Sequence, residues 1–255
     1  MYAIPAFGMD SVNSDVAYDY IRQRILRGEY PPGHPLTTSV LAEEIKVSRT
    51  PVRDALRQLE ADGLVVIRAH LGASVKTMEF TEFREMCVIR LALESHAAGL
   101  AAESRTDAEL REIRLAYEAM RKLTDRILEF EDEAIRHELV REDIRFHIGI
   151  LTAAKNLLMK KEILRLHLIN RIVSAQGGAA KLYDDETERV NNRREVMAEH
   201  AAIYQAIVRG DAPGAASAMG RHIQTIINKQ VELLERAGHG ARSRELSEEE
   251  LSYSP

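Results

Sequence analysis

Residues 38–61 read TSVLAEEIKVSRTPVRDALRQLEA, which contains two short helical patterns separated by a turn. The second pattern places apolar residues on one helical face, at Val52, Ala55, Leu56 and Leu59. Three arginines follow a different face, at Arg49, Arg53 and Arg57. This spacing predicts a helix that buries one side in a protein core and presents a basic side to its surroundings.

A further helix is predicted before this pair. Apolar residues at helical spacing cover residues 15–27, and Gly28 ends the pattern. The second helix is expected to run to Ile45 and the third to about residue 61. Hydroxyl side chains stand where helix caps are needed, Thr38 or Ser39 for the second helix and Ser48 or Thr50 for the third.

Two short β patterns follow the third helix. Residues 64–67 form an apolar, β-branched run, residues 69–72 predict a turn, and residues 73–77 are expected to return as a second strand. Three helices followed by a hairpin are the order of a winged helix-turn-helix. The sequence therefore predicts this fold for the first part of the chain.

The rest of the chain predicts a bundle of helices. After Met78 no strand pattern is evident, and helices are expected over 81–103, 107–128, 130–154, 156–176, 187–209 and 212–236. The overall expectation is a mainly α protein with two domains. These are a winged helix-turn-helix domain over 10–78 and an all-helical domain over 79–237, followed by a disordered tail over 238–255.

Composition excludes several classes of protein. The chain has 255 residues, 45% hydrophobic and 29% charged, which suits two ordinary globular domains and excludes wholesale disorder. A single cysteine excludes an intrachain disulfide framework and favours the cytoplasm. No apolar run is long enough to span a membrane. The net charge of the chain is −5, but basic and acidic residues balance within residues 10–76. Any anion-binding surface in that stretch must therefore come from local patterning.

The basic face of the third helix suits the major groove of DNA. An α-helix is narrow enough to enter that groove, and an arginine can donate two hydrogen bonds to guanine or to a phosphate. The Ser48 and Thr50 hydroxyls at the start of the helix suit phosphate oxygens. A solvated basic face without a DNA partner is the alternative. The order of short helix, turn, arginine-bearing helix and hairpin favours DNA binding.

Polar residues interrupt the apolar stripes of the later helices, at Arg90, Asp143, His147, His200 and His222. Burial without partners would be costly for such groups, so they are expected to meet one another or a ligand. One carboxylate and three imidazoles form a good set of ligands for a divalent metal such as zinc, nickel or manganese. Histidines that are satisfied within the core are the alternative.

The stretch 41–60 resembles the GntR family of bacterial transcription regulators, as do the flanking ILRGEYPPG at 25–33 and DGLV at 62–65. The resemblance covers roughly residues 14–78. It implies a homodimer that binds a pseudo-palindromic double-stranded operator. The residues expected to contact DNA are Thr37, Ser39, Lys46, Ser48, Arg49, Thr50, Arg53, His70 and Gly72.

Two positions depart from the usual pattern of that family. Lys46 stands where a glycine is usual, so the turn must use a left-handed lysine or take another form. The tip of the hairpin reads His70-Leu71-Gly72, where the family often carries Arg-Gly. The Leu71 side chain cannot hydrogen bond to DNA, whereas His70 could replace the arginine contact. Whether this hairpin, the wing of the domain, contacts DNA therefore stays open.

The later helices resemble the FCD branch of the same family, through Arg90-x3-Glu94, Asp143-x2-Phe146-His147, Glu199-His200 and His222. The resemblance implies a divalent metal, zinc first, bound by Asp143, His147, His200 and His222. It also implies a small carboxylate effector at the metal, contacted by Arg90. Arg171 and Asn192 are further candidates for the effector cavity.

The function implied is a ligand-responsive regulator that is not an enzyme, and more specifically a repressor that the effector releases from its operator. Two alternatives stay open. One is a metal-dependent hydrolase fused to a DNA-binding domain, because three histidines and an aspartate can activate water. The other is a DNA-binding dimer in which the metal is purely structural.

Overall fold

The computed structural model describes residues 7–129, 132–174 and 186–237. Contacts within the chain divide it into two units. Of the described residues, the first unit contains 7–80, 167–174 and 237, and the second contains 81–129, 132–166 and 186–236. The tail over 238–255, predicted to be disordered, lies outside the described residues. Among the described helices, none has the length and apolar character needed to cross a membrane.

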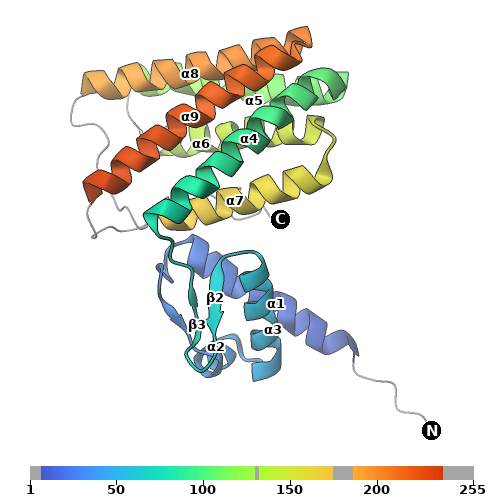
Figure 1. Cartoon of the computed structure of the whole chain (residues 1–255), viewed down its shortest axis with the longest axis vertical. Coiled ribbons are helices and arrows are strands. Elements are labelled where there is room, and N and C mark those ends of the chain that lie inside the picture. The colour runs from blue at the N-terminus through green and yellow to red at the C-terminus, as the bar shows by residue number, and fades with distance from the viewer. Residues whose placement is uncertain (1–6, 130–131, 175–185, 238–255) are drawn as a thin grey trace. The chain divides into compact units, whose positions relative to one another are not determined.

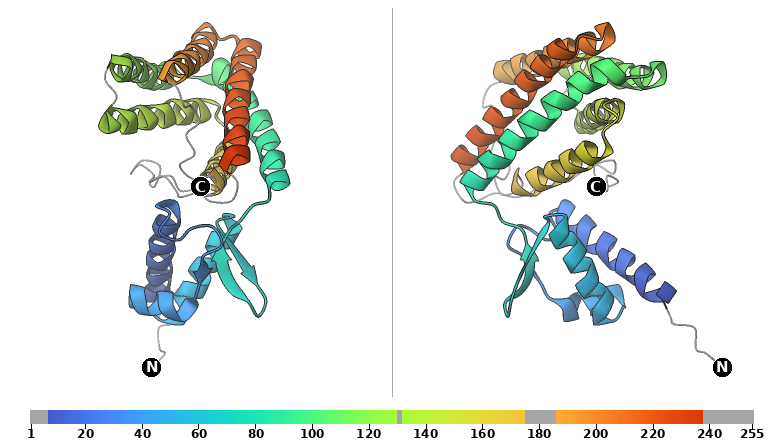
Figure 2. Two further views of the ribbon diagram at one scale, coloured as in Figure 1. Left: turned by 90° about the vertical axis from the view of Figure 1, so that its left-hand side faces the viewer. Right: turned by 45° about the vertical axis from the view of Figure 1, so that its right-hand side comes forward.

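Within the first unit, residues 7–79 form three helices and a small antiparallel sheet. Its elements are α1 (Phe7–Leu26), β1 (Pro35–Leu36), α2 (Thr38–Ile45), α3 (Arg49–Ala61), β2 (Val65–Arg68) and β3 (Gly72–Val75). The strand order is β1-β3-β2, and Figures 1 and 2 show α1 and α3 to one side of the sheet. The predicted winged helix-turn-helix is confirmed. The sequence did not predict β1, which pairs Leu36 with Ala73.

The apolar stripe of α3 forms the centre of this unit. Val52, Ala55 and Leu59 are completely buried. They share the core with Ala17 and Ile21 of α1, which are also completely buried. Because the stripe is turned inward, the arginine face of the same helix is left at the surface.

The helix caps differ in part from the prediction. The residue before α2 is Thr37, whose carbonyl accepts the first helical hydrogen bond from Leu41 N–H, so Thr38 is already helical and Ser39 follows it. Ser48 does precede α3, but neither its side chain nor that of Thr37 forms a capping hydrogen bond. The prediction of Thr38 or Ser39 as the cap of α2 was therefore wrong.

The second unit is helical throughout its described residues. Its helices are α4 (Phe80–Ser104), α5 (Asp107–Glu129), α6 (Glu133–Ala153), α7 (Leu157–Ser174), α8 (Glu186–Arg209) and α9 (Ala212–Ala237), of which α7 belongs to this unit as far as Leu166. Two of the starts are fixed by side chains. Thr106 and Glu109 bond reciprocally to each other's backbone N–H before α5, and Asp132 Oδ1 accepts from Ala134 N–H at the start of α6.

Small residues let these helices approach closely. Figures 1 and 2 show α4 and α9 side by side, and a Cβ added at Gly99 would lie 3.3 Å from the Ala212 carbonyl oxygen. A Cβ added at Gly149 of α6 would lie 3.0 Å from Ile113 Cγ1 of α5. This close packing draws the inner faces of the helices into one interior, where the polar residues of their stripes must find partners.

Candidate metal centre and nucleic-acid interface

Three histidines from three helices meet inside the second unit. They are His147 of α6, His200 of α8 and His222 of α9, and one ring nitrogen from each lies within 4.8 Å of the others. The residues are 9%, 2% and 1% exposed. The structure thus brings together the histidines that interrupt the stripes, although they are far apart in the sequence.

Hydrogen bonds on the outer side fix two of the rings. His200 Nδ1 lies 2.8 Å from the Val196 carbonyl oxygen, and His222 Nδ1 lies 2.9 Å from Glu199 Oε2. A carbonyl or carboxylate oxygen only accepts, so each Nδ1 carries the proton and each neutral ring keeps a lone pair on Nε2. The other oxygen of Glu199 accepts from the Thr225 hydroxyl at 2.7 Å, which holds the carboxylate in place.

The inner nitrogens of these two rings lack ordinary hydrogen-bond partners. Within the described residues, Nε2 of His200 and Nε2 of His222 are buried and form no well-directed hydrogen bond. His200 Nε2 does lie 3.0 Å from Asp143 Oδ1, close in distance but poorly aligned for an N–H···O bond. Two buried lone pairs beside a carboxylate oxygen are an arrangement that could hold a cation.

Burial and mutual charge shift the pKa values of Asp143 and His147 in this cluster. Burial alone would raise the pKa of Asp143, but contact with His200 and the charges of the three histidines hold it well below its usual range. Burial lowers the pKa of His147 to about 3, with the charges of His222 and His200 acting in the same direction and Asp143 opposing them. At neutral pH the aspartate is therefore an anion and the His147 ring is neutral.

The four side chains fit a divalent metal. Three imidazole nitrogens and one carboxylate oxygen are ligands that zinc and its first-row neighbours accept. The Glu199 carboxylate behind His222 and the Val196 carbonyl behind His200 are the outer partners that metal-bound histidines usually have. With four protein ligands, an octahedral metal would keep coordination positions for a further ligand.

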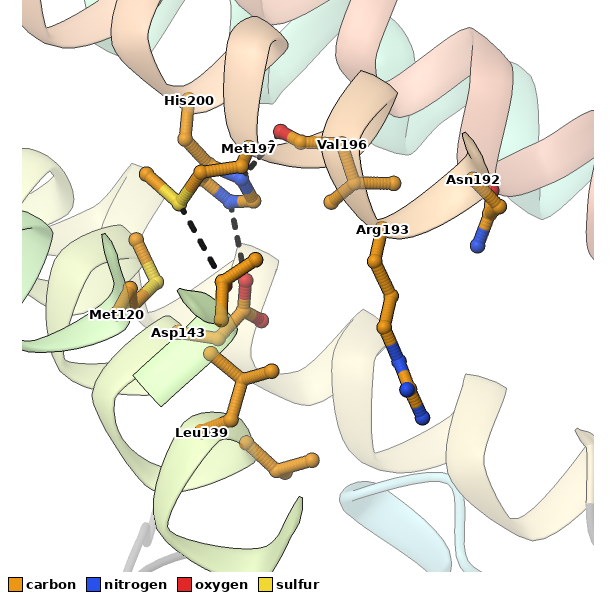
Figure 3. A pocket seen from close by; sticks show the side chains of 10 residues that line it. Met120, Leu139, Asp143, Asn192, Arg193, Val196, Met197 and His200 are labelled. Carbon is orange, nitrogen blue, oxygen red and sulfur yellow. Dashed lines mark hydrogen bonds and ion pairs between the residues drawn. The ribbon is translucent and has the colours of Figure 1, made fainter. Parts of the chain in front are cut away.

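A cavity of about 210 Å³ adjoins this cluster (Figure 3). Its lining comes from α5, α6 and α8, through Met120, Thr124, Leu139, Val140, Asp143, Asn192, Arg193, Val196, Met197 and His200. One edge of the Asp143 side chain, which is 42% exposed, therefore borders open space. The cavity leads directly to two of the four candidate ligands.

Sequence analysis missed one charged residue of this cavity, Arg193. A signal for it was present, because Arg193, Val196 and Met197 precede His200 by seven, four and three residues and so share one face of α8. Asn192, a predicted effector contact, does line the cavity. The Lys229 ammonium donates to its side-chain oxygen.

The other predicted effector contacts have different surroundings. Arg90 is 3% exposed on α4, and its Nε donates to Glu94 Oε1 at 3.0 Å. It is not among the residues that line the cavity, although the negative charge of Glu94 does act on His147. Arg171 is part of α7, but its side chain lies outside the described residues.

The residues expected to contact DNA lie at the surface of the first unit. All nine are exposed, namely Thr37, Ser39, Lys46, Ser48, Arg49, Thr50, Arg53, His70 and Gly72. On the arginine face of α3, Arg57 Nη1 lies 3.6 Å from Asp54 Oδ1. Within the described residues neither Arg49 nor Arg53 has an ion pair, so their guanidinium groups remain available to an anion.

Backbone conformation shapes both turns of this surface. Lys46, between α2 and α3, is left-handed with φ 62° and ψ 42°, so the turn keeps its usual form without glycine. At the tip of the hairpin His70 has φ 64° and Gly72 has φ 87°. Between them Leu71 is 79% exposed, so an apolar side chain lies at the surface of the hairpin tip.

Known proteins resemble the chain over most of its length. The family model "Bacterial regulatory proteins, gntR family" matches residues 13–75, and the "FCD domain" model matches residues 85–225. The HTH-type transcriptional regulator LutR of Bacillus subtilis (strain 168) is 29% identical, over 79% of this chain and 94% of its own. The HTH-type transcriptional repressor RspR of Escherichia coli (strain K12) is 25% identical, over 84% of this chain and 87% of its own.

Solved structures share the fold. E. coli McbR/YncC superimposes with a TM-score of 0.63 at 21% sequence identity, over 86% of this chain and 97% of its own. A Listeria monocytogenes regulator, Lar, superimposes with a TM-score of 0.52 at 18% identity, over 88% of this chain and 96% of its own. At this level of identity the likeness extends to the architecture alone.

Proposed function

The chain belongs to the gntR family of bacterial regulatory proteins with an FCD domain and is a DNA-binding transcription regulator, and we propose that a metal-bound carboxylate controls its binding to an operator. The observation that carries the proposal is the cluster of three buried histidines beside Asp143, with a cavity that opens onto it. The cluster provides the metal ligands and the cavity provides room for the effector.

The DNA-binding half of the proposal rests on α3. Its exposed Arg49 and Arg53 would contact bases and phosphates, and Lys46, Ser48 and Thr50 would contact the backbone at the start of the helix. One recognition helix reads too few base pairs for a specific site. A homodimer that places two such helices on a pseudo-palindromic operator would supply the missing specificity.

The regulatory half rests on the second unit. Asp143, His147, His200 and His222 would hold the metal, which supplies a positive charge and open coordination positions when it is bound. The carboxylate of a bound acid would lie at the end of the cavity that Asp143 and His200 line, and Asn192 and Arg193 line the cavity about two helical turns before His200 on α8. An acid that binds one conformation better than another shifts the population toward that conformation, and here the favoured conformation would release the operator.

Two alternatives make different predictions. A metal that only holds the bundle together would bind at the same residues without any effect of acids on DNA affinity. A hydrolase would turn over esters or lactones. The relatives named above are regulators rather than enzymes, and the open cavity beside the cluster favours a ligand-binding role over a purely structural metal.

The experiment uses the full chain loaded with zinc. Operator duplexes are first selected from a random DNA pool, and fluorescence anisotropy then measures their affinity with and without lactate, succinate and benzoate. We expect a pseudo-palindromic site and weaker binding in the presence of at least one acid. A dissociation constant unchanged by every acid, with zinc bound throughout, would favour the purely structural metal.

Matched histidine variants connect the response to the cluster. His147→Gln should abolish the acid response, whereas His137→Gln, an exposed position on the same helix, should keep it. An acid response that survives in His147→Gln would show that the effector acts elsewhere.

A further inference from the structure

The cavity beside the histidine cluster has mostly apolar walls. The aliphatic and thioether side chains that line it are Met120, Leu139, Val140, Val196 and Met197. The hydroxyl of Thr124 is directed to a neighbour in the wall, since its Oγ1 lies 3.8 Å from Met197 Sδ. The body of the cavity therefore offers little hydrogen bonding to a ligand.

Polar groups are confined to two places in the cavity. Asp143 and His200 lie together at the cluster, with His200 Nε2 3.0 Å from Asp143 Oδ1. Asn192 and Arg193 follow each other on α8, about two helical turns before His200. Figure 3 shows Met120, Met197 and Leu139 around Asp143 and His200, with Arg193 and Asn192 farther away.

Size limits the occupant further. A volume of about 210 Å³ corresponds to roughly seven water molecules at about 30 Å³ each. This is below the range of about 300–1,000 Å³ that is usual for larger organic ligands. We therefore expect the occupant that reaches the cluster to be small and to lie mainly against carbon and sulfur atoms.

We propose that the cavity selects a small monocarboxylic acid with a hydrocarbon body, in preference to a polyhydroxylated acid of the same length. The proposal rests on the proposed function for one point only, that the carboxylate binds at the cluster. The selection follows from the walls. A hydrocarbon body gains by leaving water, while each hydroxyl group of a sugar acid would lose its hydrogen bonds to water and meet Met120, Met197 or Leu139 instead.

Met120 and Met197 suit this role because thioether side chains are flexible and polarizable. They can close around a straight alkyl chain or contact the edge of an aromatic ring. The cavity walls of this chain therefore select the hydrocarbon part of the acid rather than its carboxylate.

The test compares acids of increasing chain length, and one pair of acids of equal length, on the full, zinc-loaded chain. Calorimetry measures binding of butyrate, pentanoate, hexanoate and gluconate, and elemental analysis measures zinc in the same samples. We expect affinity to rise roughly fourfold for each added methylene up to hexanoate, because each buried methylene contributes a nearly constant free energy. Gluconate, which has six carbons like hexanoate, should bind at least about tenfold more weakly.

Two variants and a matched control test the wall itself. Met197→Gln keeps the length of the side chain but makes it polar, and should weaken hexanoate binding by roughly tenfold. Thr124→Val removes a hydroxyl and should leave hexanoate binding equal or tighter. Met159→Gln, at a half-buried methionine of α7 outside the cavity, is the matched control and should have no effect.

The outcomes separate this proposal from the proposed function. If gluconate binds as tightly as hexanoate, or chain length has no effect while zinc is present, the preference for a hydrocarbon body is wrong and a metal-bound acid still stands. If the chain holds no zinc and no acid changes operator binding, the proposed function fails. Chain-length-dependent binding that Met197→Gln weakens would support the apolar cavity even then.

Discussion

At the residue scale, the histidine cluster depends on what lies behind each ring. Glu199 accepts from His222 Nδ1–H at 2.9 Å and from the Thr225 hydroxyl at 2.7 Å, so it sets both the tautomer and the direction of His222. Such outer partners commonly affect metal affinity almost as strongly as the ligands do. Glu199 is thus a positioning residue that does not itself reach the cluster.

Glu199→Gln should weaken zinc binding by roughly 10- to 100-fold, because an amide is a weaker acceptor for the imidazole N–H than a carboxylate is. Glu195→Gln, at an exposed glutamate one turn earlier on α8, is the matched control and should bind zinc like the unmodified chain. Competition with a chelator measures both constants. Equal zinc affinity in the two variants would show that Glu199 does not position His222 for the metal.

Acidification should weaken zinc binding, mainly through His200. Burial alone would lower the pKa of His200, but the adjacent Asp143 carboxylate raises it above the ordinary value. A proton on Nε2 then competes with the metal, whereas the pKa of His147, at about 3, leaves that ring neutral. The dissociation constant for zinc should rise from about pH 8 to about pH 6, and a constant value across that interval would contradict this assignment.

On α3, Arg53 and Arg57 offer a matched comparison one turn apart. Arg57 lies 3.6 Å from Asp54, while Arg53 has no ion pair in the described part of the chain. Arg53→Ala should weaken operator binding by about 1–3 kcal/mol and relax base preference at one position. Arg57→Ala should cost less. If anisotropy titrations show a larger loss of operator binding in Arg57→Ala than in Arg53→Ala, the base contact belongs to Arg57.

At the scale of elements, the helices followed from periodicity. Each predicted helix of the second unit lies within three residues of the observed one at both ends, because apolar residues recur with helical spacing and few glycines or prolines interrupt them. β1 escaped prediction because two residues, one of them Pro35, carry no periodic signal. Its position depends on pairing with β3 rather than on local preference.

Lys46, in the turn between α2 and α3, contributes both a positive charge and a left-handed backbone conformation. Lys46→Gly should relieve the backbone strain and raise the free energy of unfolding by about 1 kcal/mol, whereas Lys46→Ala should not. Both variants lose the charge, so both should reduce the salt dependence of DNA binding by about one unit of slope. Urea unfolding and titrations at several salt concentrations separate the two effects. Equal stability of the glycine and alanine variants would refute the strain argument.

At the scale of the whole molecule, the sequence indicated which polar residues meet in the interior better than where a cavity lies. The stripes identified Asp143, His147, His200 and His222, and the structure brings the three histidines together with Asp143 against His200. The cavity could not be predicted, because Met120 reaches it from α5 through helix packing that no local pattern records. Arg90 was likewise evident from its position on the stripe, but its burial and its place outside the lining of the cavity became clear only in the fold.

The central claim is that the buried histidines and Asp143 hold a divalent metal. The most direct measurement is elemental analysis of the full chain, purified without chelators and re-equilibrated with zinc, beside His200→Gln and the exposed control His137→Gln. The account predicts about one ion per chain in the unmodified protein and the control, and a large loss in His200→Gln. A full chain that remains free of metal, or a His200→Gln variant that retains it in full, would contradict the claim.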